Sequence, residues 1–200
     1  GIYTFPQPRL IFLSFFINLD RTSKSLKIPN NILFMLLSKE EILELVDKGW
    51  LVQGMLDPDI QVQPAGVDLT LAKVFALEGE GVIDFSNEKR KLPEYREIEP
   101  TEGYWMLGRG TYNATMNEYI KLPNNIAAIV LPRSSALVCG IEAHSALWDP
   151  GYEGRGSGLI VVHNPHGIIL EKNTQLAQLI LIKMSQETKK IYQGSYLCEE

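Results

Sequence analysis

The segment Trp148 to Gly154 (WDPGYEG) places a carboxylate and an aromatic ring around one tight turn. Pro150-Gly151 is a strong turn signal, with Asp149 directly before it and Tyr152 directly after it. A carboxylate held on a rigid turn can act as a general base, and the neighbouring ring can stack on a sugar or a base. The alternative is a β-hairpin whose aspartate only initiates the turn.

The segment 132–136 (PRSSA) combines a cation with two hydroxyl groups. Arg133, Ser134 and Ser135 come directly after an apolar run at 126–131. At the start of a helix, these side chains and the free backbone N–H groups could hold phosphate. One of the serines could instead serve only as the N-cap of that helix.

Two more polar residues interrupt apolar segments. Asp68 lies within 65–69 (AGVDL), and Gln178 lies within 175–179 (QLAQL). A buried polar side chain must find hydrogen-bond partners. Asp68 could therefore bond a turn, while Gln178 either bonds backbone groups or faces a site.

Several kinds of site are not indicated by the sequence. His144, His163 and His166 lack the HxH and HxxxH spacings, and neither a P-loop nor a GxSxG elbow occurs. Cys139 and Cys198 have no paired spacing, which argues against a disulfide framework or a cysteine zinc site. Such cysteine usage fits a reducing compartment, and we expect the cytoplasm.

The elements that must position these residues are short. The chain has 200 residues, with 16 glycines and 11 prolines, which suits one domain rich in turns. Ser38 and Glu41 form a capping box that predicts a helix over 38–48. Strands are predicted at 67–77, 82–85, 110–121, 126–131, 159–162 and 176–182, and a surface excursion at 86–103. Their spacing is typical of an all-β sandwich or barrel.

Charge divides the chain into two parts. The net charge is −5, although residues 1–34 are basic, so the remainder is strongly acidic. This balance argues against a protein that binds nucleic acid through a basic face. The run 10–19 is too short to span a membrane, and we expect 1–34 to be an extension outside the core fold.

Together and in this order, the four segments resemble the superfamily of trimeric dUTPases and dCTP deaminases, most closely its archaeal dUTPase branch. The segments are 65–69, 132–135, 148–154 and 175–178, and the resemblance extends over 35–196. It implies an all-β fold, a distorted jelly-roll β-barrel with a short N-terminal helix, within a catalytic domain at 35–200. It also implies a homotrimer with sites at the subunit interfaces.

The resemblance further implies a reaction and a role for each residue. The enzyme would hydrolyse dUTP to dUMP and pyrophosphate, with Asp149 activating the attacking water and Gln178 helping to position it. Asp68 would hold Mg²⁺ through water. Substrate contacts would come from Arg133, Ser134, Ser135, His144, Trp148, Tyr152 and Gln193.

Two positions bear on the alternative activity, deamination of dCTP. Deaminase members of the superfamily carry an arginine where this chain has Val138, and a glutamate where it has Val161. Valine cannot move protons between water and a cytosine ring, so the sequence favours the diphosphatase. A nucleotide-binding member without catalytic activity is a third possibility.

Overall fold

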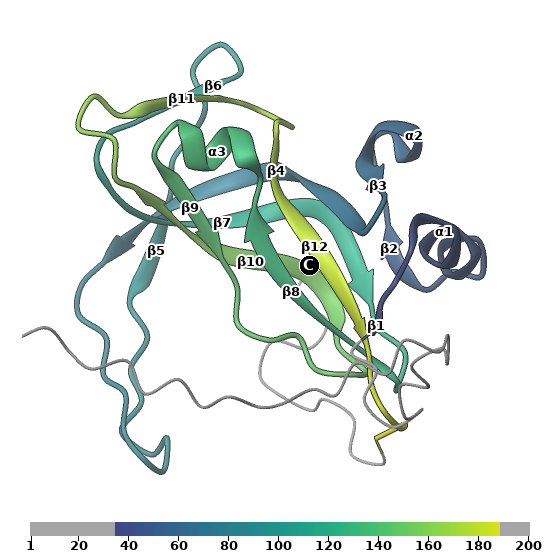
Figure 1. Ribbon diagram of the computed structural model, residues 1–200. Coiled ribbons are helices and arrows are strands. Elements are labelled where there is room, and N and C mark those ends of the chain that lie inside the picture. Colours follow the sequence, from purple (N-terminus) through teal and green to yellow (C-terminus); the bar gives the residue numbers. More distant parts are fainter. Residues whose placement is uncertain (1–34, 189–200) are drawn as a thin grey trace, which may run out of the picture. The chain divides into compact units, whose positions relative to one another are not determined.

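The computed structural model describes residues 35–188, which form antiparallel strands and short helices (Figure 1). The helices are α1 (Lys39–Asp47), α2 (Pro58–Gln61) and α3 (Ser134–Val138). The strands are β1 (Met35–Leu36), β2 (Leu51–Gln53), β3 (Val62–Gln63), β4 (Gly66–Glu78), β5 (Glu94–Glu97), β6 (Tyr104–Leu107), β7 (Gly110–Lys121), β8 (Ile126–Pro132), β9 (Ile141–His144), β10 (Glu153–Val162), β11 (Ile168–Glu171) and β12 (Gln175–Lys183). The expectation of an all-β fold is confirmed.

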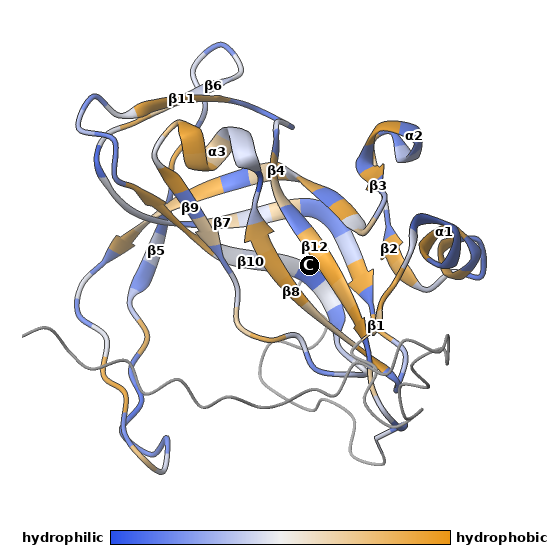
Figure 2. Cartoon of the chain, viewed as in Figure 1, coloured by the Kyte–Doolittle hydropathy of each residue, from blue (hydrophilic) through white to orange (hydrophobic). Residues whose placement is uncertain are grey.

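Strand β4 belongs to two parts of the main sheet. Its first half pairs with β12, which also pairs with β8 and β1. Its second half pairs with β7 and β5, and β7 continues to β10 and β9. The sheet therefore curls, and hydrophobic residues along β8 and β12 contribute to the core (Figure 2).

The long strand β7 shows how the sequence pattern produces this core. Ala114, Met116 and Ile120 alternate with more exposed residues and are buried, as period-two side chains of a half-buried strand should be. Leu122-Pro123 ends the strand, since proline has no N–H to donate to a ladder. β7 is thus a rigid strand with one face in the core.

Helix α1 begins where the capping box predicts. The Ser38 N–H donates to the Glu41 carboxylate (3.0 Å), and the Glu41 N–H donates to the Ser38 hydroxyl (3.4 Å). Ile42 anchors the helix in the core, and Gly49, with φ of 78°, follows its end.

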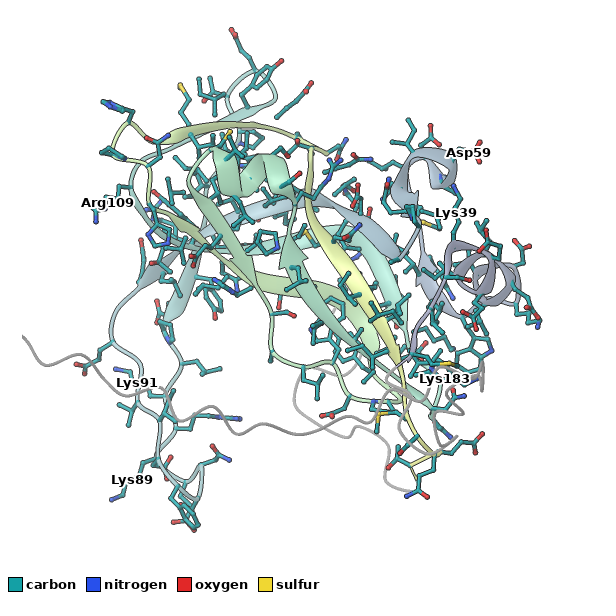
Figure 3. The ribbon with its side chains drawn as sticks, in the orientation of Figure 1. Lys39, Asp59, Lys89, Lys91, Arg109 and Lys183 are labelled. Carbon is teal, nitrogen blue, oxygen red and sulfur yellow. The ribbon has the colours of Figure 1, made fainter. Side chains whose placement is uncertain are left out.

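The predicted strand at 82–85 is wrong. Within it only Val82 pairs, through one isolated bridge to Lys91, while Ile83 and Phe85 are exposed. No neighbouring strand lies beside this stretch. The predicted surface excursion instead spans 79–93, with Lys89 at its far end (Figure 3), because β5 begins at Glu94.

β6 and β11 form a separate two-stranded sheet, which the pattern of apolar runs does not predict. Among the helices of residues 35–188, none is both long enough and apolar enough to cross a membrane. The predicted extension 1–34 lies outside the described residues.

Candidate active site

Asp149 lies between two anchored points of a hairpin. On one side, Trp148 exchanges two backbone hydrogen bonds with Ala128 (2.8 and 2.9 Å). On the other side, the Leu122 N–H donates to the Tyr152 carbonyl (2.8 Å). The Asp149 carboxylate is exposed and hydrogen-bonds no other residue of the described part of the chain. These backbone bonds therefore fix the turn that carries the Asp149 carboxylate.

A cleft of about 270 Å³ opens beside this turn. It is lined by hairpin residues 146–149, by Tyr152, and by Tyr95 and Asn113 of neighbouring strands. The rings of Trp148 and Tyr152 are stacked, with centroids 5.4 Å apart and planes at 19°. We call this the hairpin cleft, and its aromatic wall suits a flat or ring-shaped ligand.

A second group of predicted residues meets where β4, β8 and β12 run side by side. Arg133 lies at the end of β8, and its Nε atom is 3.0 Å from Oδ2 of the buried Asp68. The Arg133 Nη1 atom donates to the Gln175 side chain (2.7 Å). We call Asp68, Arg133, Gln175 and Gln178 the Arg133 cluster. Arg133 is thus held by two partners while about a third of its side chain stays exposed.

Asp68 is the acid of this cluster, and the pKa of its carboxyl is shifted. Burial raises the pKa of its carboxyl, while the positive charge of Arg133 and a hydrogen bond from Gln178 oppose the rise. Gln178 pairs with Asp68 across the β12–β4 ladder. Gln178 thus lies beside Asp68, and its predicted role at a site stays a prediction.

Helix α3 begins directly after Arg133. Arg133 is the N-cap residue, and its side chain makes no capping hydrogen bond. Neither serine is therefore the N-cap: Ser134 and Ser135 are the first two helical residues, and both are exposed. Their hydroxyls and N–H groups lie next to the exposed part of Arg133.

The hairpin cleft and the Arg133 cluster are separate within one chain. The separation can be followed along strand β8. Pro132 pairs with Ala177 at the end near the Arg133 cluster, whereas Ala128 bridges to Trp148 of the hairpin. Four residues of extended strand span about 13 Å. One chain therefore presents two half-sites rather than one joined pocket.

His144 lies on the outer face of β9. Its Nε2 atom is 2.8 Å from Oε2 of Glu142, and the His163 Nε2 atom is 3.4 Å from the same oxygen. These two contacts lower the pKa of Glu142. Glu142 also pairs with Val161 across the β10–β9 ladder. A carboxylate therefore lies beside Val161, the position at which deaminase members of the superfamily are expected to carry a glutamate.

Sequence reasoning missed a buried polar network behind the Arg133 cluster. Glu118 of β7 is fully buried and accepts hydrogen bonds from Gln61 Nε2 (2.7 Å), Thr70 N (3.0 Å) and Thr70 Oγ1 (2.6 Å). Gln61 also donates to the Asp68 carbonyl (2.8 Å). The alternation along β7 could have indicated this buried acid, because Glu118 falls in the same period-two series as the buried Ala114, Met116 and Ile120. Gln193 lies outside the described residues.

The side chains that could bind a metal ion can be compared with what the expected Mg²⁺ site requires. In residues 35–188, no group of three or more His, Cys, Asp or Glu side chains is placed to hold a metal ion. Mg²⁺ usually keeps several waters and binds one or two carboxylates together with substrate phosphates. The buried Oδ2 of Asp68 accepts no hydrogen bond from the described residues, although it is paired with Arg133. Asp68 supplies one carboxylate here, which is buried and already paired with Arg133.

A sequence model of the family described as dCTP deaminase-like matches residues 36–184. The chain belongs to the dCTP deaminase-like family. The match spans both half-sites, from Asp68 of β4 to Gln178 of β12.

Relatives in this family include proteins named for dUTP hydrolysis. A probable deoxyuridine 5'-triphosphate nucleotidohydrolase of Archaeoglobus fulgidus is 44% identical over 160 residues, covering 80% of this chain and 94% of that one. The deoxyuridine 5'-triphosphate nucleotidohydrolase of Methanocaldococcus jannaschii is 46% identical over 138 residues, covering 68% and 86%.

A solved structure supports the fold of the family. The 2'-deoxycytidine 5'-triphosphate deaminase from Agrobacterium tumefaciens superimposes with a TM-score of 0.54 at 23% identity. The match covers 74% of this chain and about half (48%) of that one. At this identity the likeness concerns the fold alone.

Proposed function

We propose that the chain hydrolyses dUTP to dUMP and pyrophosphate. The names and identities of the archaeal relatives support this substrate. The observation that carries the proposal is the Asp149 carboxylate, which lies on a turn fixed by backbone hydrogen bonds, has no partner within residues 35–188, and lines an aromatic cleft.

Asp149 acts on the attacking water. The water oxygen bonds to the α-phosphorus while the bond from that phosphorus to the α–β bridging oxygen breaks. Asp149 takes the proton, and pyrophosphate leaves. A general base of this kind contributes about 10²- to 10⁴-fold to the rate. Tyr152 supports the sugar through its stacked ring. Gln178 helps to position the water.

Arg133, Ser134 and Ser135 bind the phosphates from a neighbouring copy of the chain. The separation of about 13 Å along β8 supports this arrangement, because it places the hairpin and Arg133 of one chain at different positions along the strand. A homotrimer, as in the predicted assembly, would bring the hairpin cleft of one copy to the Arg133 cluster of the next. His144, Trp148 and Gln193 complete the proposed substrate contacts.

Mg²⁺ is the proposed cofactor, with Asp68 holding it through water. When bound, it neutralises phosphate charge as the leaving group departs. The local cation of Arg133 is needed as well, because the chain is acidic overall and repels a triphosphate at long range. The exposed free thiol of Cys139 supports a reducing compartment such as the cytoplasm.

The test replaces Asp149 with asparagine. Asp149→Asn should keep dUTP binding in calorimetry and lose about 10²-fold or more of pyrophosphate release. Asp59→Asn is the matched control, since Asp59 is an exposed acid on α2 (Figure 3). Near-normal turnover by Asp149→Asn would exclude Asp149 as the base.

A second candidate activity is deamination of dCTP. The observation that favours it is Glu142 beside Val161, where it is joined to His144 and His163. Incubation with dCTP and detection of any uracil nucleotide tests it. A protein that binds dUTP and releases neither pyrophosphate nor uracil product would be the non-catalytic binder.

A further inference from the structure

Asn113 is a polar residue between hydrophobic neighbours on the outer face of β7. Its cross-strand partners are Leu159 of β10 and Phe75 of β4. It is half-buried and lines the hairpin cleft together with Asp149 and Tyr152. An amide in such surroundings needs a hydrogen-bond partner, because an unsatisfied polar group is costly once water is excluded.

The structure gives the Asn113 side chain no such partner among residues 35–188. Other asparagines of this region behave differently. Asn117, four residues further along β7, donates to Thr70 Oγ1 (2.9 Å) and to the Asn173 side chain (3.0 Å). Asn164 donates to the Cys139 carbonyl (3.2 Å). Asn117 and Asn164 therefore hold the fold together, whereas Asn113 lines the cleft and its amide has no partner within residues 35–188.

We propose that Asn113 hydrogen-bonds the edge of the pyrimidine ring in the hairpin cleft. The inference deepens the proposed function and rests on it for the identity of the ligand. A side-chain amide offers one donor side and one acceptor side. The edge of uracil offers an N–H next to a carbonyl oxygen, and the edge of cytosine offers a ring nitrogen next to an amino group.

Because no residue of the described chain fixes its orientation, the Asn113 amide can rotate to match either edge. It supplies affinity for a pyrimidine without choosing between uracil and cytosine. A carboxylate at this position has acceptors only. It would accept from the uracil N–H or the cytosine amino group, but it would repel the neighbouring uracil carbonyl oxygen or cytosine ring nitrogen, so it should weaken the binding of both bases.

The experiment measures the dissociation constants of dUMP and dCMP by calorimetry, so that it does not depend on hydrolysis. Asn113→Asp should weaken the binding of dUMP and of dCMP about tenfold, because the carboxylate meets one acceptor on each edge. Asn113→Leu, which is similar in size and apolar, should weaken both nucleotides about tenfold. Asn113→Ser is a second, smaller replacement should the leucine variant fold poorly, and it should also weaken both.

The matched control is Thr111→Asp. Thr111 lies on the same strand and face, pairs with Val161, and does not line the cleft, so this variant should keep wild-type binding. The inference is overturned if all three Asn113 variants bind both nucleotides within twofold of wild type, or if the wild type binds neither. Nucleotide binding that responds to Asn113 without any dUTP hydrolysis would overturn only the proposed function.

Discussion

The Nε atom of Arg133 lies 3.0 Å from Oδ2 of Asp68, which joins the residue before α3 to the buried part of β4. A second nitrogen of the same guanidinium bonds the Gln175 side chain. The chain thus uses a buried anion and an amide to orient one cation. In the proposed function, this cation binds phosphate.

Replacing Arg133 with lysine should show that geometry matters as well as charge. A lysine ammonium is a point charge that cannot meet Asp68 and Gln175 at once. We expect Arg133→Lys to lower kcat/KM for dUTP by about 10- to 100-fold, mainly by raising KM, and Gln175→Leu to have a smaller effect in the same direction. Steady-state kinetics measure both, and a lysine variant within twofold of wild type would contradict this account.

The Asp68 carboxyl should leave a signature in stability against pH. Burial raises the pKa of Asp68 above its ordinary value of 3.8, so the folded state keeps this proton to higher pH than the unfolded chain. Its contribution to stability therefore grows as the pH falls through the folded pKa toward 3.8 and declines as the pH rises.

Asp68→Asn does not titrate at this position. Thermal melts should be recorded for wild type and variant between about pH 7 and pH 4. The difference in melting temperature, wild type minus variant, should increase as the pH falls. A shift with the opposite sign, or a difference independent of pH, would contradict the raised pKa.

Gly156 lies against the aromatic wall of the hairpin cleft. A Cβ atom there would be 2.6 Å from Cη2 of Trp148, and the backbone of Gly156 is not in the left-handed region. The effect of Gly156→Ala is therefore steric. We expect a loss of about 1 to 3 kcal/mol in the free energy of unfolding, with a changed near-ultraviolet circular dichroism from the Trp148–Tyr152 stack. Gly108→Ala, with open space around it, should leave both measurements unchanged.

Glu118 is the buried acceptor of three hydrogen bonds from Gln61 and Thr70. Glu118→Gln turns an amide N–H₂ toward groups that themselves donate. Urea unfolding should show a loss of about 2 to 3 kcal/mol. Glu94→Gln removes an exposed carboxylate of β5 and should change stability by less than about 0.5 kcal/mol. Equal effects of the two changes would argue against the network.

The long strands could be predicted because each carries a full pattern. β7 and β12 have enough residues for alternation or an apolar run to stand out, and the capping box of α1 is a local signal. β6, β9 and β11 have four residues each, and their pairing is set by distant partners. The stretch 82–85 looks like a strand in composition but forms only the single bridge from Val82 to Lys91.

The site was predictable in its parts but not in its arrangement. Turn and phosphate chemistry make Asp149, Tyr152 and Arg133 candidates, while their roles come from the resemblance to the family and stay predictions. The separation of the two half-sites depends on where β8 meets β12 and the hairpin, which no local pattern encodes. Asn113 belongs to the cleft only because β7 lies beneath the hairpin, so its role required the tertiary fold.

Strand β12 pairs with β1, β4 and β8, and it is the last strand of the described chain. During synthesis, β4 and β8 leave the ribosome before β12 exists, and their edges toward it stay open. Open strand edges expose unpaired N–H and C=O groups that invite association with other chains. The nascent protein is therefore vulnerable to aggregation until β12 emerges, and chaperones that cover strand edges should matter up to that moment.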